Sequence, residues 1–379
     1  MTHRPLSRRA ALCQLGGLAA APALAQPADE LLDYAPRARP PEGYPAAYAT
    51  TVRAAEDEGR LSIHSTTDER VAAPLVADFR RLYPRIAVAY EDLGSTELYH
   101  RFIAENQLGR EAADVLWSSA MDHMVALATA GHALAYASPE QGHLPAWAQW
   151  QDRLWATTYE PVVFAHHKPS LPEGEVPRSH AALARWLAGA QGGAVSYDIQ
   201  KSGVGYFLAA QDAAASEATF WATAQALGAG RARLLLTTDA MVRQIADGRA
   251  RLGLNLLGAY TVAQARERPT LGVVFPEDYT LVTSRVLLIN SRAAHPNAAR
   301  LWLDYLLSRR GQTVMATAAR LYALREDATG ETTGTALRQL LGSRARPVAL
   351  GPGLAAPLAN AAYRDFILRW RAALGYGKG

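Results

Sequence analysis

The sequence predicts an α/β protein with largely parallel sheets, folded into two lobes. The main observation is a repeating unit in which a short apolar strand runs into a hydroxyl-rich junction and then into an amphipathic helix. This alternation is typical of parallel sheets covered by helices. A second observation is length. The roughly 354 residues that follow a predicted export segment are more than a single hydrophobic core usually holds. A third is composition: 49% of the residues are hydrophobic, which argues against disorder.

The first 25 residues are predicted to be an export signal rather than part of the fold. Arg4, Arg8 and Arg9 give a positively charged start, and the largely apolar residues 10–25 end in the small-residue pattern Ala-Leu-Ala. The stretch SRRAAL resembles a twin-arginine export signal, and a general secretory signal is the alternative. The apolar stretch is shorter than the roughly 20 residues that span a bilayer. We therefore expect a periplasmic chain that begins at Gln26.

Removal of this signal leaves a nearly neutral chain without cysteine. The sequence has 39 basic and 35 acidic residues, and the signal holds three of the basic ones, which leaves 36 against 35. The basic isoelectric point therefore does not indicate a polyanionic partner such as nucleic acid. Cys13, the only cysteine, lacks the small preceding residue expected of a lipid-modified cysteine. Its loss with the signal suits an oxidising compartment and excludes thiol catalysis and zinc-thiolate sites.

The repeating unit begins after a leader, residues 26–50, which is rich in proline and alanine and is predicted to be extended. The strand RLSIHS (60–65) leads into TDERVAAPLVADFRRLYP (67–84), where apolar residues recur at helical spacing before a proline. The strand IAVAYEDLG (86–94) leads into a helix through a Ser-Thr pair, and ADVLW (113–117) leads into another through a Ser-Ser pair. The first half of the chain thus carries three such units.

The same unit recurs in the second half. The strand GGAVSYDI (192–199) reaches Lys201, Ser202 and Gly203 before a helical pattern, and RARLLL (231–236) reaches a Thr-Thr-Asp junction. Ligands of open α/β sheets bind beyond the carboxyl ends of the strands, where helix N-termini favour anions. The alternative is that these hydroxyls are ordinary helix N-caps. Because such junctions occur in both halves of the chain, we expect them to line one cleft.

Several longer stretches resemble the periplasmic solute-binding proteins of ABC importers, in the iron(III)-type branch also called solute-binding family 1. The similarity runs from about residue 58 to 345 and is carried by ADVLWSSAMDHMVAL (113–127), YDIQKSGVGY (197–206), LGLNLLGAY (252–260), FPEDYTLVTSRVLLIN (275–290) and AHPNAARLWLDYLLSRRGQ (294–312). The last is the most specific, because it combines a proline near the helix start, a long apolar stripe and a terminal Gly-Gln. None of these stretches is a catalytic motif.

The resemblance implies a two-lobed, Venus-flytrap fold of type II with two β-strand hinge crossings, at residues 154–167 and 278–290. Lobe one is then expected over 51–157 with 285–379, and lobe two over 158–284. Hinge closure around a ligand is the expected motion. The resemblance also implies an inner-membrane ABC permease as partner and a monomeric state. A sensor role, in which the liganded protein docks to a membrane kinase, is an alternative with the same fold.

The resemblance leaves two ligand classes open. Ferric-ion-binding members use two adjacent tyrosines near the end of lobe two, and this sequence has Tyr260 alone there, which counts against iron. His64 and Glu91 remain candidate ferric ligands in that alternative. The branch with N-x-x-G-x-Y here and an Asp beside KSG is more similar to binders of organic anions, including phosphorylated sugars. We therefore expect a small organic anion, with no metal and no cofactor.

The resemblance assigns the ligand contacts residue by residue. Lobe one would hold the anionic group with hydroxyls, and lobe two would add donors, hydroxyl-binding groups, phenols and one cation. These residues are Ser65, Thr66, Ser95, Thr96, Ser118, Tyr159, Asp198, Lys201, Ser202, Gly203, Asn255 and Tyr260. Lys201 is equally interpretable as a solvated surface residue.

Two features bear on other functions. Acidic residues, among them Asp68, Asp122 and Asp239, cluster near the same junctions. They are interpreted as helix-start residues, although several of them pointing inward would favour a cation or a polyol. No nucleophile elbow, zinc-protease motif or phosphate loop occurs, so no enzyme is predicted.

Overall fold

The computed structural model describes residues 40–41, 43–110, 112–189 and 192–375. The predicted export signal and the leader up to residue 39 lie outside the described residues. The described end of the leader packs on the fold, because Tyr48 is buried and its hydroxyl donates to Asp304 Oδ2 at 2.7 Å. No helix among the described residues is long and apolar enough to cross a membrane.

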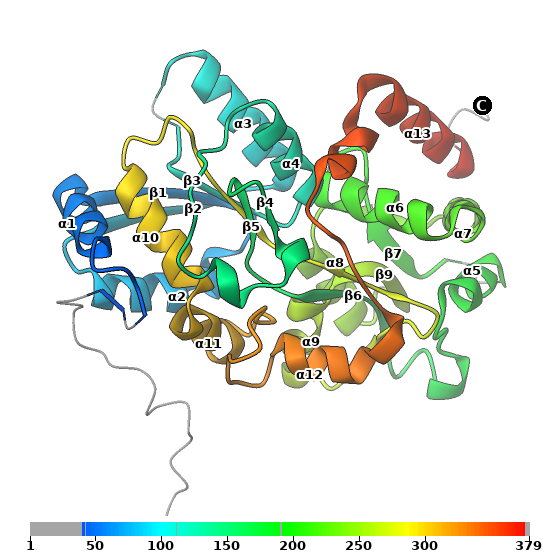
Figure 1. Ribbon diagram of the computed structural model, residues 1–379. Coiled ribbons are helices and arrows are strands. Elements are labelled where there is room, and N and C mark those ends of the chain that lie inside the picture. Colours follow the sequence, from blue (N-terminus) through cyan, green and yellow to red (C-terminus); the bar gives the residue numbers. More distant parts are fainter. Residues whose placement is uncertain (1–39, 42, 111, 190–191, 376–379) are drawn as a thin grey trace, which may run out of the picture.

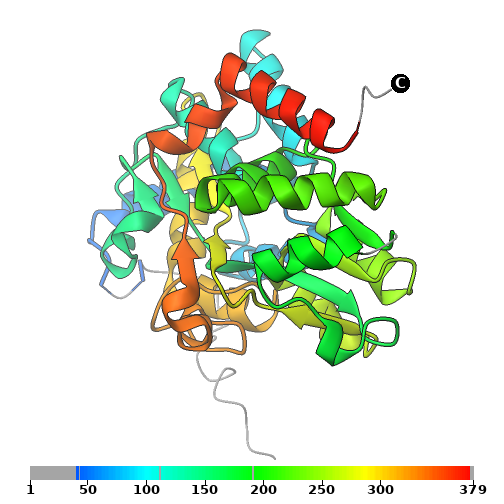
Figure 2. The same ribbon diagram turned by 90° about the vertical axis from the view of Figure 1, so that its right-hand side faces the viewer.

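The chain forms two sheets that lie side by side, each covered by helices (Figures 1 and 2). The first sheet has the order β2-β1-β3-β12-β5-β4, formed by Ala87–Asp92, Arg60–Ser65, Val115–Ser118, Val286–Ile289, Leu154–Ala156 and Gln149–Trp150. Strands β1, β2 and β3 are parallel, and β12 runs antiparallel to β3 and β5. We call this sheet and its helices lobe one.

The second sheet has the order β13-β11-β6-β9-β7-β8, with β10 paired to β6. Its strands are Ala345–Pro347, Thr280–Thr283, Glu160–His167, Leu252–Leu257, Ala194–Tyr197, Arg233–Leu235 and, for β10, Leu271–Val274. Strands β7, β8 and β9 are parallel, whereas β6 runs antiparallel to its neighbours. We call this sheet and its helices lobe two. Five of the parallel strands of the two lobes, β1, β2, β3, β7 and β8, are those that the strand–junction–helix pattern predicted, and β9 is an addition.

Helices follow the parallel strands as expected. Lobe one carries α1 (Tyr48–Glu58), α2 (Glu69–Leu82), α3 (Ser95–Gln107), α4 (Met121–Thr129), α10 (Pro296–Leu307) and α11 (Arg309–Thr317). Lobe two carries α5 (His180–Gly189), α6 (Gly203–Ala215), α7 (Glu217–Ala229), α8 (Thr238–Ala246) and α9 (Gly258–Glu267). In α2 the side chains of Leu75, Val76, Phe79 and Leu82 are buried, so the helical spacing of these apolar residues does form the inner face.

The chain passes between the sheets at residues 157–159 and 284–285, which confirms the predicted two-crossing α/β fold. The two crossings are bonded to each other: Arg285 N donates to Thr158 Oγ1 at 2.8 Å, and Thr157 N donates to Arg285 O at 2.9 Å. Ser284 Oγ also donates to the Thr158 carbonyl at 2.5 Å. The hinge is therefore a paired strand segment rather than a loose linker.

The C-terminal segment returns to lobe two after α12 (Gly334–Leu341). Strand β13 pairs in parallel with β11, and α13 (Asn360–Ala373) packs beside α6 and α7 (Figure 1). Between them, the short helix η6 (Pro352–Leu358) lies against α4 of lobe one. The sequence did not predict this return. The predicted boundaries, 51–157 with 285–379 for lobe one and 158–284 for lobe two, stay a prediction. In the structure the C-terminal segment contacts both sheets and their helices.

Candidate functional site

A cavity of about 460 Å³ lies between the two lobes. Its lobe-one wall comes from the starts of α2 and α3 and from the turn after β3, and its lobe-two wall comes from the starts of α6, α8 and α9. The lining residues are Thr66, Asp68, Leu93, Gly94, Ser95, Thr96, Glu97, His100, Ser119, Tyr197, Lys201, Ser202, Val204, Leu236, Thr237, Thr238, Asp239, Leu257 and Tyr260. We call this the interlobe cavity.

Five helices of the described chain begin at the wall of this cavity. Their N-cap residues, which all line it, are Asp68 of α2, Gly94 of α3, Ser202 of α6, Thr237 of α8 and Leu257 of α9. Each helix start carries a partial positive charge and N–H groups without an intrahelical partner. The cavity wall is therefore suited to oxygen acceptors and to negative charge.

The first amides of α6 are already bonded across the cleft. Gly203 N donates to Thr96 Oγ1 and Val204 N donates to Ser95 Oγ, both at 3.0 Å. Thr96 Oγ1 also donates to the Lys201 carbonyl at 3.0 Å. Two hydroxyls of lobe one thus serve as caps for a helix of lobe two, which holds the lobes in a closed arrangement.

Tyr260 forms a second contact between the lobes. Asp68 N donates to its hydroxyl at 3.2 Å, and the Asp68 side chain also bonds this hydroxyl. On its other side, the guanidinium carbon of Arg285 lies 5.0 Å from the centre of the Tyr260 ring. Burial raises the pKa of Tyr260 above its ordinary value, although Arg285 opposes this shift. The phenol is therefore held neutral.

The charged side chains of the cavity are mainly acidic. Asp68, Glu97 and Asp239 line it, against Lys201 and His100. Asp239 forms an ion pair with Arg243 and accepts from Gln264 Nε2 at 2.8 Å. Lys201 Nζ lies 3.3 Å from Asp198 Oδ2. Carboxylates accept hydrogen bonds from hydroxyl or amino groups, so the wall offers acceptors as well as the donors of the helix starts.

Six of the predicted contacts line the cavity, and they come from both lobes: Thr66, Ser95, Thr96, Lys201, Ser202 and Tyr260. Thr66 Oγ1 accepts from Ser119 N at 2.9 Å, which joins the ends of β1 and β3. Ser202 Oγ donates to the Leu236 carbonyl at 3.0 Å and caps α6 by accepting from Gly205 N. The hydroxyl of Ser202 is therefore both a cap and part of the wall.

Two predicted hydroxyls turn into lobe one instead. Ser65 is fully buried, and its hydroxyl donates to the Trp117 carbonyl at 2.8 Å. Ser118 is 1% exposed, and its hydroxyl accepts from Ala120 N at 3.1 Å. Neither lines the interlobe cavity. Both hydroxyls form hydrogen bonds within lobe one, at the turns that follow their strands.

The four other predicted residues also lie outside the set that lines the cavity. Tyr159 is at the hinge, with its ring 5.8 Å from that of Trp147. The Asp198 carboxylate accepts a hydrogen bond from Gln200 N. The Asn255 side chain bonds Asp212 beside a separate cavity of about 20 Å³. Gly203 packs against His123 of α4. Gly203 still contributes its N–H to the Thr96 contact.

The structure adds residues that sequence reasoning left out of the site. Glu97 and His100 lie on α3 one turn apart, and Ser119, Thr237 and Thr238 follow strands. The last three stand in hydroxyl junctions that the sequence displays, so the junction pattern could have included them. The sequence does not mark Glu97 and His100 as site residues, because charged residues within a helix usually face solvent.

The residues considered for iron lie elsewhere. His64 Nε2 lies 3.5 Å from Glu91 Oε2, and Glu91 is paired with Arg101 at 2.6 Å. Neither His64 nor Glu91 lines the interlobe cavity. Burial lowers the pKa of His64. Among the described residues, no group of three or more His, Cys, Asp or Glu side chains is placed to hold a metal ion.

Comparison with solved structures supports the fold at two levels of similarity. The substrate-binding protein of an ABC transporter from Agrobacterium tumefaciens is 35% identical, with a TM-score of 0.78 over 83% of this chain and 94% of that one. Iron-bound HitA from Pseudomonas aeruginosa is 16% identical, with a TM-score of 0.68 over 83% and 99%. AfuA from Actinobacillus pleuropneumoniae, with fructose-6-phosphate bound, is 19% identical, with a TM-score of 0.68 over 84% and 99%.

The two more distant structures share the fold, and their own ligands differ. No curated protein matches the sequence. A family model described as bacterial extracellular solute-binding protein matches residues 65–318, which hold the starts of all five helices that border the cavity. On this match and the 35% identity to an ABC-transporter component, the chain belongs to the family of bacterial extracellular solute-binding proteins, as a periplasmic solute-binding component of an ABC transporter.

Proposed function

We propose that the chain captures a small organic anion that also carries hydroxyl groups, such as a phosphorylated sugar, and delivers it to an inner-membrane ABC permease. The observation that carries this proposal is the composition of one wall: five helix starts stand beside the carboxylates of Asp68, Glu97 and Asp239. Helix starts favour an anionic oxygen, and carboxylates accept from sugar hydroxyls. A solute with anionic groups alone would offer no hydrogen-bond donor to these carboxylates.

The same wall argues against ferric ion as the solute. A ferric site that uses phenolate together with carboxylate oxygen would need an ionised tyrosine here, whereas Tyr260 is a neutral phenol engaged with Asp68. Tyr197, the other lining tyrosine, shares its hydroxyl with Thr238 Oγ1 at 2.6 Å, and burial raises its pKa to about 12. The fold is shared with AfuA, which has fructose-6-phosphate bound, and equally with iron-bound HitA, so the choice of ligand class rests on the residues of the wall.

The proposal is tested by thermal unfolding of the mature protein with fructose 6-phosphate, glucose 6-phosphate, fructose, inorganic phosphate and ferric citrate. A ligand at about 100 times its Kd adds roughly 2.7 kcal/mol to the free energy of unfolding, which raises the melting temperature by several degrees. We expect this rise with a sugar phosphate and not with fructose or phosphate alone. A rise with ferric citrate only would overturn the proposal.

Glu97→Gln separates binding from stability. The Glu97 side chain lines the cavity and is exposed, so neutralising it leaves the fold intact. We expect about tenfold weaker binding of the sugar phosphate that raises the melting temperature, with an unchanged melting temperature of the free protein. Glu326→Gln, an exposed glutamate outside the cavity, is the matched control. Equal binding by both variants would remove Glu97 from the site.

A further inference from the structure

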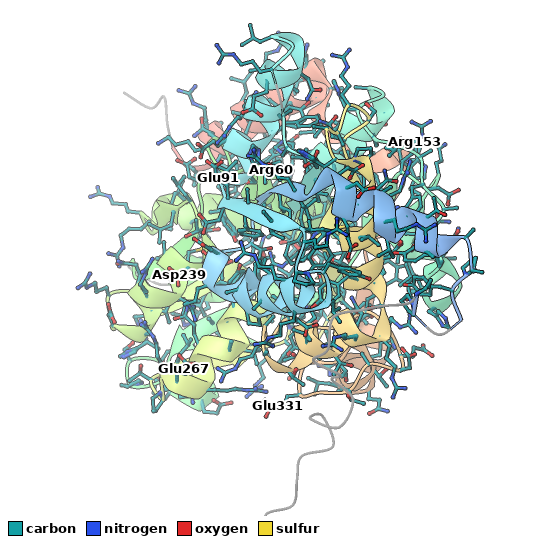
Figure 3. The ribbon with its side chains drawn as sticks, turned by 90° about the vertical axis from the view of Figure 1, so that its left-hand side faces the viewer. Arg60, Glu91, Arg153, Asp239, Glu267 and Glu331 are labelled. Atoms are coloured by element: carbon teal, nitrogen blue, oxygen red, sulfur yellow. The ribbon has the colours of Figure 1, made fainter. Side chains whose placement is uncertain are left out.

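A second cavity of about 250 Å³ lies behind Tyr260. It too is formed by both lobes: Arg70 and Val71 come from α2, Ala263, Gln264 and Glu267 come from α9, and residues 318–321 close it. Figure 3 views this side of the molecule, with Asp239 and Glu267 labelled on the lobe-two side of α2. We call this the rear chamber.

Tyr260 alone contributes to the walls of both cavities. Its hydroxyl meets Asp68 N at 3.2 Å, at the long end of hydrogen-bond distances. This contact separates the interlobe cavity, which we also call the front cavity, from the rear chamber. A solute longer than the interlobe cavity would reach the rear chamber by displacing the two bonds between Asp68 and the Tyr260 hydroxyl.

The charges of the two spaces have opposite sign. The front cavity is lined by three carboxylates and one lysine, whereas the rear chamber has two arginines and one carboxylate. Within the rear chamber, Arg320 Nη1 bonds Glu267 Oε1 at 2.8 Å. Arg70 has no ion-pair or hydrogen-bond partner anywhere in the described part of the chain. Arg70 is exposed to solvent, so the rear chamber holds one positive charge that water, and no acidic side chain, compensates.

Helix stability does not explain these two arginines. Arg70 is the second residue of α2, where a cation faces the positive end of the helix dipole. Arg320 has a φ of 55°, in the left-handed region that costs free energy for a residue with a side chain. Both arginines border the same chamber. Arg320 already has Glu267 as its partner, so Arg70 is the residue for which a ligand would provide the compensating interaction.

We propose that the rear chamber binds a second anionic group of an elongated solute, with Arg70 as the residue that contacts it. This inference rests on the proposed function and narrows the substrate class to a solute with two anionic ends joined by a hydroxylated chain. One end lies at the helix starts of the front cavity, and the other forms charge-assisted hydrogen bonds with the Arg70 guanidinium.

Fructose 6-phosphate and fructose 1,6-bisphosphate test this, because they differ by one phosphate. Their dissociation constants are measured by titration calorimetry for the wild type and for Arg70→Gln. We expect the wild type to bind the bisphosphate about tenfold more tightly than the monophosphate. In Arg70→Gln the ratio should fall to about one, with the affinity for the monophosphate unchanged. Arg81→Gln, on the same helix but outside both cavities, is the control and should keep the wild-type ratio.

The outcomes separate the two proposals. Equal affinities of the wild type for both sugars would overturn the rear-chamber proposal and leave the proposed function standing. The same loss in Arg70→Gln and Arg81→Gln would also overturn it, since the effect would then be one of overall charge. Failure of both sugars to bind the wild type would overturn the rear-chamber proposal, and the thermal-unfolding series decides separately on the proposed function.

Discussion

At the scale of single residues, the main feature is the buried ion pair between Arg285 and Glu160, which lies at the base of the cleft. Arg285 is fully buried, and its Nε lies 2.9 Å from Glu160 Oε1. Arg285 lies in one crossing and Glu160 is the first residue of β6, directly after the other crossing, so the pair joins the two. Because Arg285 also lies under the Tyr260 ring, the pair supports a wall residue of the cavity from behind.

Glu160→Gln should destabilise the protein strongly. The guanidinium would remain charged and buried without its counter-charge, which costs about 3–5 kcal/mol. Urea unfolding monitored by circular dichroism measures this difference. Glu217→Gln, which breaks the exposed pair with Arg369, is the control and should cost less than about 1 kcal/mol. A similar small loss in both variants would show that the buried pair contributes nothing to the fold.

Asp122 makes stability depend on pH. Burial raises its pKa to about 7, whereas the pKa of the unfolded state is 3.8. Between these values the folded state holds a proton that the unfolded state has released, so the free energy of unfolding falls as pH rises. The neighbouring His123 acts in the opposite sense from about pH 4 to 6.5, because burial lowers its pKa to about 4.

Asp122→Asn isolates the contribution of the carboxyl. An amide is neutral at every pH and keeps the oxygen that accepts from His123 N at 2.8 Å. Relative to the wild type, the variant should be more stable at pH 8 than at pH 5, by at most about 2.7 kcal/mol. Urea unfolding of both proteins at the two pH values gives this difference. No change in the difference would mean that Asp122 is ionised in the fold at both values.

The sequence showed which junctions carry hydroxyls but not which hydroxyl of a pair faces the cavity. Successive side chains at a strand end point to opposite faces. At the end of β1, Thr66 lines the cavity and Ser65 is buried; after β3, Ser119 lines it and Ser118 is buried. The residues of a junction are the same whichever side chain faces the cavity, so only the position of the strand in the sheet decides which hydroxyl lines the cavity.

At the scale of elements, the start of α6 is a point of close contact between the lobes. A side chain placed on Gly203 would put its Cβ 2.4 Å from Cε1 of His123, and this ring is stacked on Tyr99 with centres 4.5 Å apart. Since His123 belongs to α4 of lobe one, the glycine is required by the contact between lobes. Its backbone conformation alone would permit other residues.

Gly203→Ala should therefore hold the lobes apart while both stay folded. We expect a larger radius of gyration by small-angle X-ray scattering, and about tenfold weaker binding of any solute that needs closure. Gly174→Ala, in lobe two with open space around its Cα, is the matched control. A variant with the wild-type radius and affinity would contradict the view that this contact defines the closed state.

The pattern of elements was more predictable than the path of the chain end. Local apolar spacing determines alternating strands and helices, which is why β1, β2, β3, β7, β8 and the helices after them could be predicted from sequence. The pairing of β13 with β11 and the position of α13 depend on contacts between residues far apart in the chain. Local pattern contains no information on such contacts.

At the scale of the whole molecule, the C-terminal segment is a third link between the lobes beside the two crossings. Helix η6 lies on lobe one, while aromatic rings of α13 pack on lobe two, with Tyr206 and Tyr363 4.7 Å apart. The Tyr206 hydroxyl donates to the Pro357 carbonyl at 2.6 Å, which ties α6 to η6. Hinge motion must therefore be accommodated by this segment as well.

Tyr206→Phe tests this link, because it removes one hydrogen bond and keeps the ring. The loss of a typical hydrogen bond, about 1 kcal/mol, should raise the rate of amide exchange in residues 352–374 by roughly fivefold. Hydrogen exchange measured by mass spectrometry resolves this segment from the rest of the chain. Tyr363→Phe is the matched control, since its ring belongs to the same cluster and no hydrogen bond of its hydroxyl joins the two lobes among the described residues. If both variants exchange alike, the segment is held by ring packing, and the bond to η6 plays no part in coupling it to lobe movement.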